Sequence, residues 1–375
     1  IQSSAIVDGV RKAISRNSYY VVDQERNEVR GYAFSLTDKE FGATGIHSWT
    51  ITFPPESGNI VGFSRKPSKS ESVHAWVKVP GDRSTMFKYV NPNVFFIATD
   101  DGRGIHAHLV EGVSGRIIYR VHHAKAKGPV FASLCENWIT YSYYDTDAQR
   151  HAISVLEVYD DSEARKNKAV SELVLKSLFG SSNNKTSGSS YSARNTQTDD
   201  DEMVLSSFTP PPLRVLGQSY FIRPGTKFMR VTTSARGITG HQVLLGTDTD
   251  QVVALDKRWL DPRRPTKPST FDQEEGLIPY MEVLPLMPAS WVTNKNVVAR
   301  LKDVITAPTD LESTVLCMAR GVDVFYTRLH PSQSFDALDE EFSYGLLIIS
   351  LLVVGIGALV THGMSVKATS RRLWK

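Results

Sequence analysis

Apolar residues recur along this chain in short runs that alternate with turn residues, and one much longer apolar run lies near the C-terminus. Short runs rich in Val, Ile, Tyr, Phe and Trp, bounded by Gly, Asp and Asn, are typical of β-strands joined by tight turns. Few stretches carry helical periodicity, so the pattern predicts an all-β fold. The predicted strands are 19–22, 29–34, 94–98, 105–110, 116–121, 130–134, 138–144, 153–158, 242–245, 252–255, 314–318 and 322–327.

A β-propeller of meander blades is the architecture that we expect from this strand pattern. The strands form up-and-down units that continue over most of the chain. This stretch of strands is longer than one sandwich contains. A β-sandwich remains the alternative, because the sequence shows no strict repeat signature.

The long apolar run, residues 342–366, contains no Asp, Glu, Lys or Arg. As a helix it would reach roughly 37 Å, enough to cross a hydrocarbon core of about 30 Å. An interior helix of a large soluble protein is the alternative, but such a helix is rarely apolar on every face. We therefore expect a single transmembrane helix.

Charges on either side of this helix predict its orientation. Acidic residues precede it at 336, 339, 340 and 341, and basic residues follow it at 367, 371, 372 and 375. Because positive residues stay on the cytosolic side, residues 1 to about 340 are expected in a lumen or outside the cell. A tail-anchored protein, with its main body in the cytosol, is the alternative. Ile1 is not a natural start, so we expect any signal peptide to precede it.

Within the helix, small or weakly polar residues fall on one face. Ser350, Val354, Gly357 and Thr361 have the spacing of such a stripe, so Ser350, Gly357 and Thr361 are the predicted helix-packing residues. Lipid contact alone is the alternative, because small residues are common in any membrane helix.

Apolar and aromatic residues near the two ends of the helix are candidates for the membrane interface. The predicted interface residues are Phe335, Leu338 and Trp374. Phe335 and Leu338 belong to a short amphipathic turn that could lie on the bilayer surface.

Composition narrows the function of the rest of the chain. A net charge of +3 with 22% charged residues, and no basic stripe with interleaved aromatics, argues against nucleic-acid binding. Cys135 and Cys317 are the two cysteines, which could form one bridge or remain separate core thiols. No C-x-x-C spacing suggests a zinc site.

A polar segment interrupts the strands. Residues 162–178 have a helix-forming composition, whereas 180–202 is dominated by Ser, Asn, Thr and Asp and is predicted to be a disordered loop. Asn184 begins the sequon Asn-Lys-Thr and is the predicted glycosylation site if the loop meets a lumen.

The search for catalytic chemistry is largely negative. The sequence contains no G-x-S-x-G, H-E-x-x-H, P-loop or G-x-G-x-x-G motif, so we expect no catalytic residue and no cofactor. His106, His108, His122 and His123 form the one notable constellation, because a hairpin turning at 113–114 would bring His122 near His106. Imidazoles so placed can bind a transition metal, yet no carboxylate or thiol is expected to complete the set. We therefore expect a partly exposed sheet surface and no metal.

Ordered short motifs also give the chain a family resemblance. The motifs are Gly-Asp-Arg-Ser (81–84), Lys-Tyr (88–89), Asn-Pro-Asn (91–93), Gly-Arg-Ile-Ile (115–118), Ala-Lys-Gly-Pro-Val (126–130), Glu-Asn-Trp (136–138), Arg-Gly-Ile-Thr (236–239), Leu-Asp-Pro-Arg-Arg-Pro (260–265), Leu-Ile-Pro-Tyr (277–280), Thr-Ala-Pro (306–308), Leu-Glu-Ser-Thr (311–314) and Thr-Arg (327–328). With these motifs the chain resembles, over nearly its whole length, the C-terminal part of the family of endoplasmic reticulum membrane protein complex subunit 1. The segment 180–202 departs from the family.

The resemblance implies a lumenal propeller held by one helix in the endoplasmic reticulum membrane. It implies a noncatalytic scaffold in a complex that inserts tail-anchored and multipass clients without nucleotide energy. Partners would be the other subunits, client membrane proteins and the lipid bilayer. A membrane-anchored lumenal propeller enzyme, of the quinoprotein kind, or a receptor is the alternative. The expected parts are propeller (1–179), loop (180–202), further propeller strands and the family's C-terminal domain (203–333), juxtamembrane segment (334–341), transmembrane helix (342–366) and basic cytosolic tail (367–375).

Overall fold

The computed structural model describes residues 17–36, 43–67, 71–161, 206–208, 210–333, 335–336 and 343–373. The chain divides into two compact units, Ile1–Ser332 and Gln333–Lys375.

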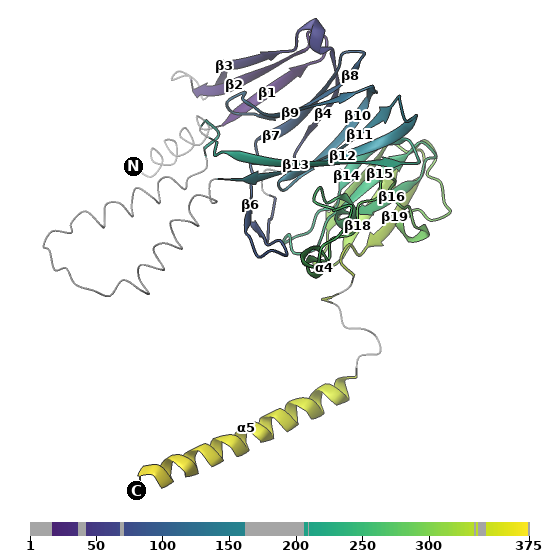
Figure 1. Cartoon of the computed structure of the whole chain (residues 1–375). Helices are drawn as coiled ribbons and strands as arrows, with labels where there is room; N and C mark the ends of the chain where they lie inside the picture. The colour runs from purple at the N-terminus through teal and green to yellow at the C-terminus, as the bar shows by residue number, and fades with distance from the viewer. Residues whose placement is uncertain are drawn as a thin grey trace, which may run out of the picture. The chain divides into compact units, whose positions relative to one another are not determined.

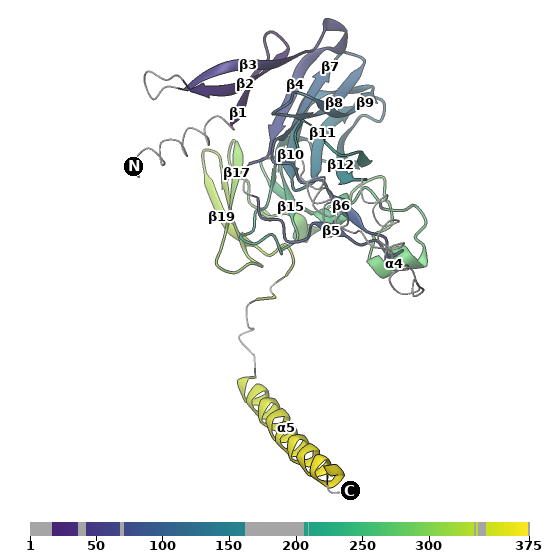
Figure 2. The ribbon, with the colours of Figure 1, turned by 90° about the vertical axis from the view of Figure 1, so that its left-hand side faces the viewer.

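The described part of the first unit is built from five antiparallel sheets (Figures 1 and 2). The first sheet is β1 (Ser18–Asp23), β2 (Glu28–Leu36) and β3 (Ala43–Thr52); the second is β4 (Asn59–Arg65), β7 (Val94–Asp100), β8 (Gly104–Glu111) and β9 (Ile117–Ala124). The third is β10 (Ala126–Cys135), β11 (Trp138–Asp145), β12 (Arg150–Asp160) and β13 (Leu213–Ile222), with β6 (Met86–Lys88) and β5 (Val77–Lys78) added beside β12. The fourth is β14 (Thr226–Val231), β15 (Gln242–Thr247) and β16 (Val252–Asp256), and the fifth is β17 (Asp303–Pro308), β18 (Val315–Arg320) and β19 (Val324–Leu329).

Four hydrophobic cores separate these five sheets in chain order. On β7, Phe95 faces the core shared with the first sheet, whereas Phe96 faces the core shared with the third. On β15, Val243 faces the third sheet and Leu244 faces the fifth. Because side chains alternate between the faces of a strand, a strand buried on both faces appears in the sequence as a short continuous apolar run.

The all-β propeller architecture predicted from the sequence is confirmed. Each predicted strand corresponds to an observed one, within a few residues at its ends. The strands that pattern analysis missed are β3, β4, β5, β6, β13, β14 and β17. β3 is mostly exposed, and β5 and β6 have only two and three residues, so they depend on pairing with neighbours rather than on an apolar run. Residues 162–178 and the loop 180–202 lie outside the described residues.

The described part of the first unit also contains a short helix and two buried thiols. Helix α4 (Thr270–Glu275) begins with a capping box between Ser269 and Asp272 and ends at Gly276, whose φ is 76°. Cys135 and Cys317 are both buried free thiols and lie in different cores, which resolves the two alternatives left open above.

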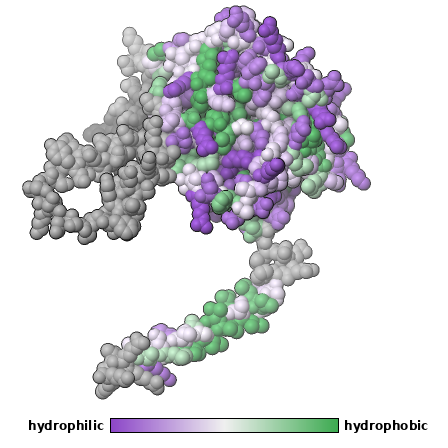
Figure 3. Space-filling view, in the orientation of Figure 1, coloured by the Kyte–Doolittle hydropathy of each residue, from purple (hydrophilic) through white to green (hydrophobic). Residues whose placement is uncertain are grey.

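The described part of the second unit contains one helix, α5 (Tyr344–Leu373). Its stretch Tyr344–Ser370 is long and apolar enough to cross a membrane. Figure 3 shows hydrophobic surface along its middle part. The helix also runs on through Lys367, Arg371 and Arg372, so most of the predicted basic tail continues the same helix.

Candidate functional site

The predicted packing residues lie on α5 with their polar groups already satisfied. Ser350 donates to the carbonyl oxygen of Leu347 at 2.7 Å, and Thr361 donates to that of Gly357 at 2.9 Å. Such bonds within the helix allow hydroxyl side chains to lie in an apolar environment. Ser350, Gly357 and Thr361 are all exposed, so they are available to a partner helix or to lipid.

The other predicted surface residues are mostly outside the described part of the chain. Leu338, Trp374 and Asn184 all lie in segments that the structure does not describe. Phe335 is described, and its side chain is 53% exposed.

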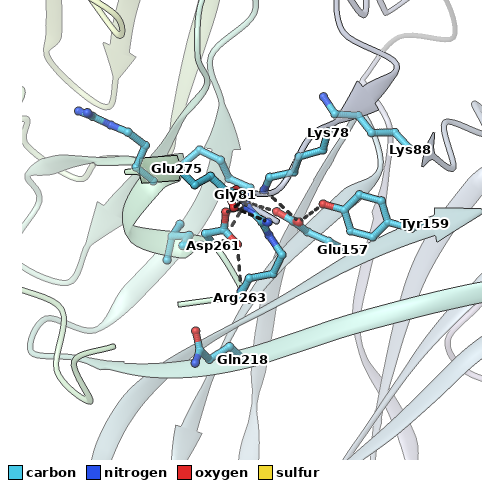
Figure 4. A network of polar contacts seen from close by, with 12 residues as sticks. Lys78, Gly81, Lys88, Glu157, Tyr159, Gln218, Asp261, Arg263 and Glu275 are labelled. Atoms are coloured by element: carbon cyan, nitrogen blue, oxygen red, sulfur yellow. Dashed lines mark hydrogen bonds and ion pairs between the residues drawn. The ribbon is translucent and has the colours of Figure 1, made fainter. Parts of the chain in front are cut away.

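A network of charged side chains joins segments that are far apart in the sequence (Figure 4). Glu157 on β12 accepts from Lys257 at 2.5 Å and from the hydroxyl of Tyr159 at 2.5 Å. Lys78 lies 3.7 Å from Glu157 and donates to Asp261 at 2.7 Å. Two carboxylates and two cations alternate through this cluster, so its formal charges balance.

Arg263 continues the network toward helix α4. Its guanidinium donates to Asp261 at 3.1 Å and pairs with both oxygens of Glu275. Glu275 also accepts from the backbone nitrogen of Gly81 at 3.0 Å. The turn at 81–84 is thereby connected to α4 through one carboxylate.

Charge balance keeps these buried acids ionised. Burial would raise the pKa of Asp261, but Lys78, Lys257 and Arg263 together hold that pKa below its usual value. Burial likewise opposes ionisation of Glu157, and Lys257 and Lys78 lower its pKa below the ordinary value. A carboxylate that stays charged only because its partners stay in place is suited to fixing a structure.

Arg264 connects two other loops without a carboxylate. Its buried guanidinium donates to the carbonyl oxygens of Trp259 at 2.7 Å, Ile278 at 3.1 Å and Pro279 at 2.5 Å. It also lies over the rings of Tyr220 and Trp259. The segments 260–265 and 277–280, both of which carry the family resemblance, are therefore held together by one side chain.

Glu312 connects another pair of resemblance motifs. Its carboxylate accepts from the backbone nitrogens of Arg236 at 2.9 Å, Ile238 at 2.8 Å and Thr239 at 3.3 Å. Burial opposes the charge, yet these bonds and one from Ser234 keep the pKa of Glu312 lowered. The motif at 236–239 is in this way bound to the motif at 311–314.

Beside Arg263 the surface is hollowed. The cavity has a volume of about 830 Å³, and its lining includes the turn 80–86, the end of β12 and helix α4. Acidic and basic side chains both line it, among them Asp82, Arg83, Asp160, Arg214, Arg263 and Asp272. Mixed charge of this kind fits contact with a polar surface better than selection of one small ion.

The histidine constellation is brought together in part. His106 on β8 pairs with His122 on β9, and their ring centroids are 4.3 Å apart. His108 stacks next to His106 at 6.4 Å, but His123 points elsewhere and contacts Tyr141 and Tyr143.

Two details of the histidine prediction are wrong. A carboxylate does join the group, because the Oδ2 atom of Asp101 lies 3.1 Å from Nε2 of His106. The four side chains also do not share one partly exposed surface, since His108 is only 2% exposed. Asp101 was missed because it lies in the turn before β8, outside the strand pattern from which the group was read.

Comparison with known proteins agrees with this architecture. Residues 2–332 match the family described as "ER membrane protein complex subunit 1, second beta-propeller". The chain is 31% identical over 365 residues to "ER membrane protein complex subunit 1" of Gallus gallus, covering 95% of this chain and 33% of that protein. It is 30% identical over 366 residues to the same-named protein of Xenopus laevis, covering 95% of this chain and 33% of that one. The relative from Schizosaccharomyces pombe is 24% identical over 359 residues, 94% of this chain and 37% of its own length.

The fold and the apolar helix define the class: a β-propeller domain followed by one helix able to span a membrane. Within that class, the chain belongs to the family of ER membrane protein complex subunit 1. It spans about a third of the length of the vertebrate relatives that it matches.

Sequence reasoning did not identify the charged network. Lys78 and Asp261 are separated by 183 positions, so no local pattern could pair them. The motifs that carry the family resemblance were the only indication of these contacts, because hydrogen bonds join several of the motifs to one another.

Proposed function

We propose that this chain is part of a noncatalytic scaffold subunit of a membrane protein complex of the endoplasmic reticulum. The complex would insert transmembrane segments of tail-anchored and multipass clients without nucleotide energy. The propeller would lie in the lumen, and α5 would hold it in the membrane as a single-pass anchor with a cytosolic C-terminus. Other subunits, client proteins and lipid would be the partners.

The observation that supports this proposal most strongly is that charged side chains in the first unit are paired with one another. Lys78, Glu157, Asp261, Arg263 and Glu275 are paired with one another and connect loops from three parts of the chain. Charged groups locked in this way brace a surface and are not free to bind or transfer protons. The hollow beside Arg263 is lined by residues of this braced region, as expected for a rigid platform for other proteins.

Features of α5 support the same role. The helix offers lipid a broad apolar surface and offers another helix a narrow stripe at Ser350, Gly357 and Thr361. A stripe of small residues lets two helix backbones approach closely, which favours packing between subunits. In this proposal the propeller parts would end at residue 333, the transmembrane helix would span 342–366, and 367–375 would be the basic cytosolic tail.

Purification tests the proposal directly. The chain, isolated from endoplasmic reticulum membranes in mild detergent, should carry a stable set of membrane proteins in fixed ratios. As a control, the same chain with 343–373 replaced by an unrelated membrane-spanning helix should stay in the membrane but lose part of that set. Recovery of a lone chain with a bound redox cofactor would instead support an anchored enzyme.

A further inference from the structure

Three potential metal ligands meet at one corner of the second sheet. Asp101 lies in the turn after β7, His106 lies on β8, and His122 lies directly opposite it on β9. One ligand atom from each side chain lies within 4.8 Å of the other two. Three segments of the chain therefore direct two imidazoles and a carboxylate toward one point.

Asp101 is held in place by its own turn. Its Oδ1 atom accepts from the backbone nitrogens of Arg103 at 2.8 Å and Gly104 at 2.7 Å. The carboxylate is consequently fixed by the turn, while Oδ2 remains directed at His106 at 3.1 Å.

The backbone makes room for His122. A Cβ atom at residue 104 would lie 2.3 Å from the carbonyl oxygen of His123 and 2.7 Å from Nε2 of His122, so glycine here leaves room for both. His122 is exposed, whereas His106 is largely covered, with 14% of its side chain accessible. The group is thus open to solvent on one side and supported on the other.

Beneath the group lies a layer of rings. His106 stacks on His108, which is buried, and His108 lies against the ring of Phe53, with centroids 5.1 Å apart. A cation also lies beside His106, because the Nη2 atom of Arg120 is 3.4 Å from Nδ1 of His106.

We propose that Asp101, His106 and His122 form a binding site for one divalent transition-metal ion, with zinc the best match. Two imidazole nitrogens and one carboxylate oxygen are a donor set that zinc accepts, whereas calcium and magnesium prefer oxygen alone. Ligands on one tetrahedral zinc ion lie roughly 3.3 Å apart, close to the observed distance between Asp101 and His106. The metal replaces the proton shared by Nε2 of His106 and Oδ2 of Asp101, and water takes the open fourth position.

The site goes beyond a scaffold role and does not depend on it. A metal here would link the turn after β7 to both strands of the β8–β9 hairpin. Arg120 opposes the metal by its charge and by donating to His106, but it is exposed and can turn into solvent. Its removal should therefore strengthen metal binding.

The test uses the full chain in mild detergent, without a histidine tag, after treatment with a chelator. Zinc is titrated in competition with a chromogenic indicator, and cobalt is followed by its visible absorption. The parent chain should bind one equivalent of each metal. His122→Asn and Asp101→Asn should each weaken binding by at least about tenfold, since even residues that only orient ligands cost 10- to 100-fold.

Matched variants separate this site from other causes. Asp101→Asn keeps a side-chain oxygen that accepts hydrogen bonds from the turn, and His122 is exposed. Neither Asp101→Asn nor His122→Asn should therefore change the melting temperature of the metal-free chain. His47→Asn removes a different exposed imidazole and should leave binding unchanged, whereas Arg120→Ala should tighten it. The proposal is overturned if the parent chain binds no zinc, or if His47→Asn and His122→Asn weaken binding equally.

Discussion

At the scale of single residues, the charged groups of the first unit derive their properties from partners remote in the sequence. Asp261 keeps its charge although its side chain is only 10% exposed, because Lys78 and Arg263 contact it. Exposed ion pairs contribute little to stability, but removing one member of a buried pair leaves the other uncompensated. The network should therefore be much more sensitive to substitution than the surface.

Replacing Asp261 by Asn should lower the free energy of unfolding of the first unit by about 3 to 5 kcal/mol. The loss arises because only two carboxylates, Glu157 and Glu275, would then remain to balance the three cations Lys78, Lys257 and Arg263. Urea unfolding of the detergent-solubilised chain, followed by tryptophan fluorescence, measures the difference. Asp256→Asn is the matched control, because Asp256 pairs with Arg258, whose side chain is 77% exposed, and should cost less than about 1 kcal/mol.

The difference in unfolding free energy between the parent chain and Asp261→Asn should become smaller at low pH. The pKa of Asp261 is lowered in the folded chain, so its charge stabilises the fold above the unfolded pKa of about 3.9 and stops doing so as pH falls through the folded value. The gap between the parent and Asp261→Asn should therefore persist from neutral pH down to about pH 4 and narrow below it. Equal gaps for Asp261→Asn and Asp256→Asn at pH 7 would contradict this account.

At the scale of elements, α5 combines an apolar surface with a stripe of small residues. Thr361 and Ser350 bond to their own helix, so neither hydroxyl requires a partner. In the proposed packing, the stripe would therefore act by its small volume and not by its polarity. Packing against another helix depends on how closely the two backbones can approach at Gly357.

Gly357→Leu should reduce recovery of co-purifying membrane subunits, because a leucine side chain would hold a partner helix away. Quantitative immunoblotting after mild-detergent isolation measures the loss. Gly355→Leu is the matched control, since it adds the same bulk two residues away, on another face of the helix. Equal recovery for the two variants would exclude a contact at the stripe and favour lipid on all sides.

At the scale of the whole molecule, the sequence predicts strands that have a clear local pattern. It does not predict contacts between residues that are far apart in the chain. β7 and β8 were predictable because both faces of each are buried, which requires runs of apolar residues. β13 was not, because Gly217, Gln218 and Ser219 interrupt its apolar residues and its register comes from β12. The pairing of His106 with His122 followed from hairpin geometry, whereas Asp101 and Asp261 lie in turns whose placement no periodicity encodes.

Orientation in the membrane is the prediction on which the proposed function of the whole molecule most depends. It rests on acidic residues before α5 and basic residues after it, and a new glycosylation site in the first unit can test it. Arg83→Asn creates the sequon Asn-Ser-Thr at an exposed turn, and φ of 63° at this residue suits asparagine. In a chain whose natural sequon is removed by Asn184→Gln, Arg83→Asn should add one endoglycosidase-sensitive glycan and Arg83→Gln none. Absence of that glycan, together with protease digestion of the first unit in intact microsomes, would place the propeller in the cytosol and exclude a lumenal scaffold.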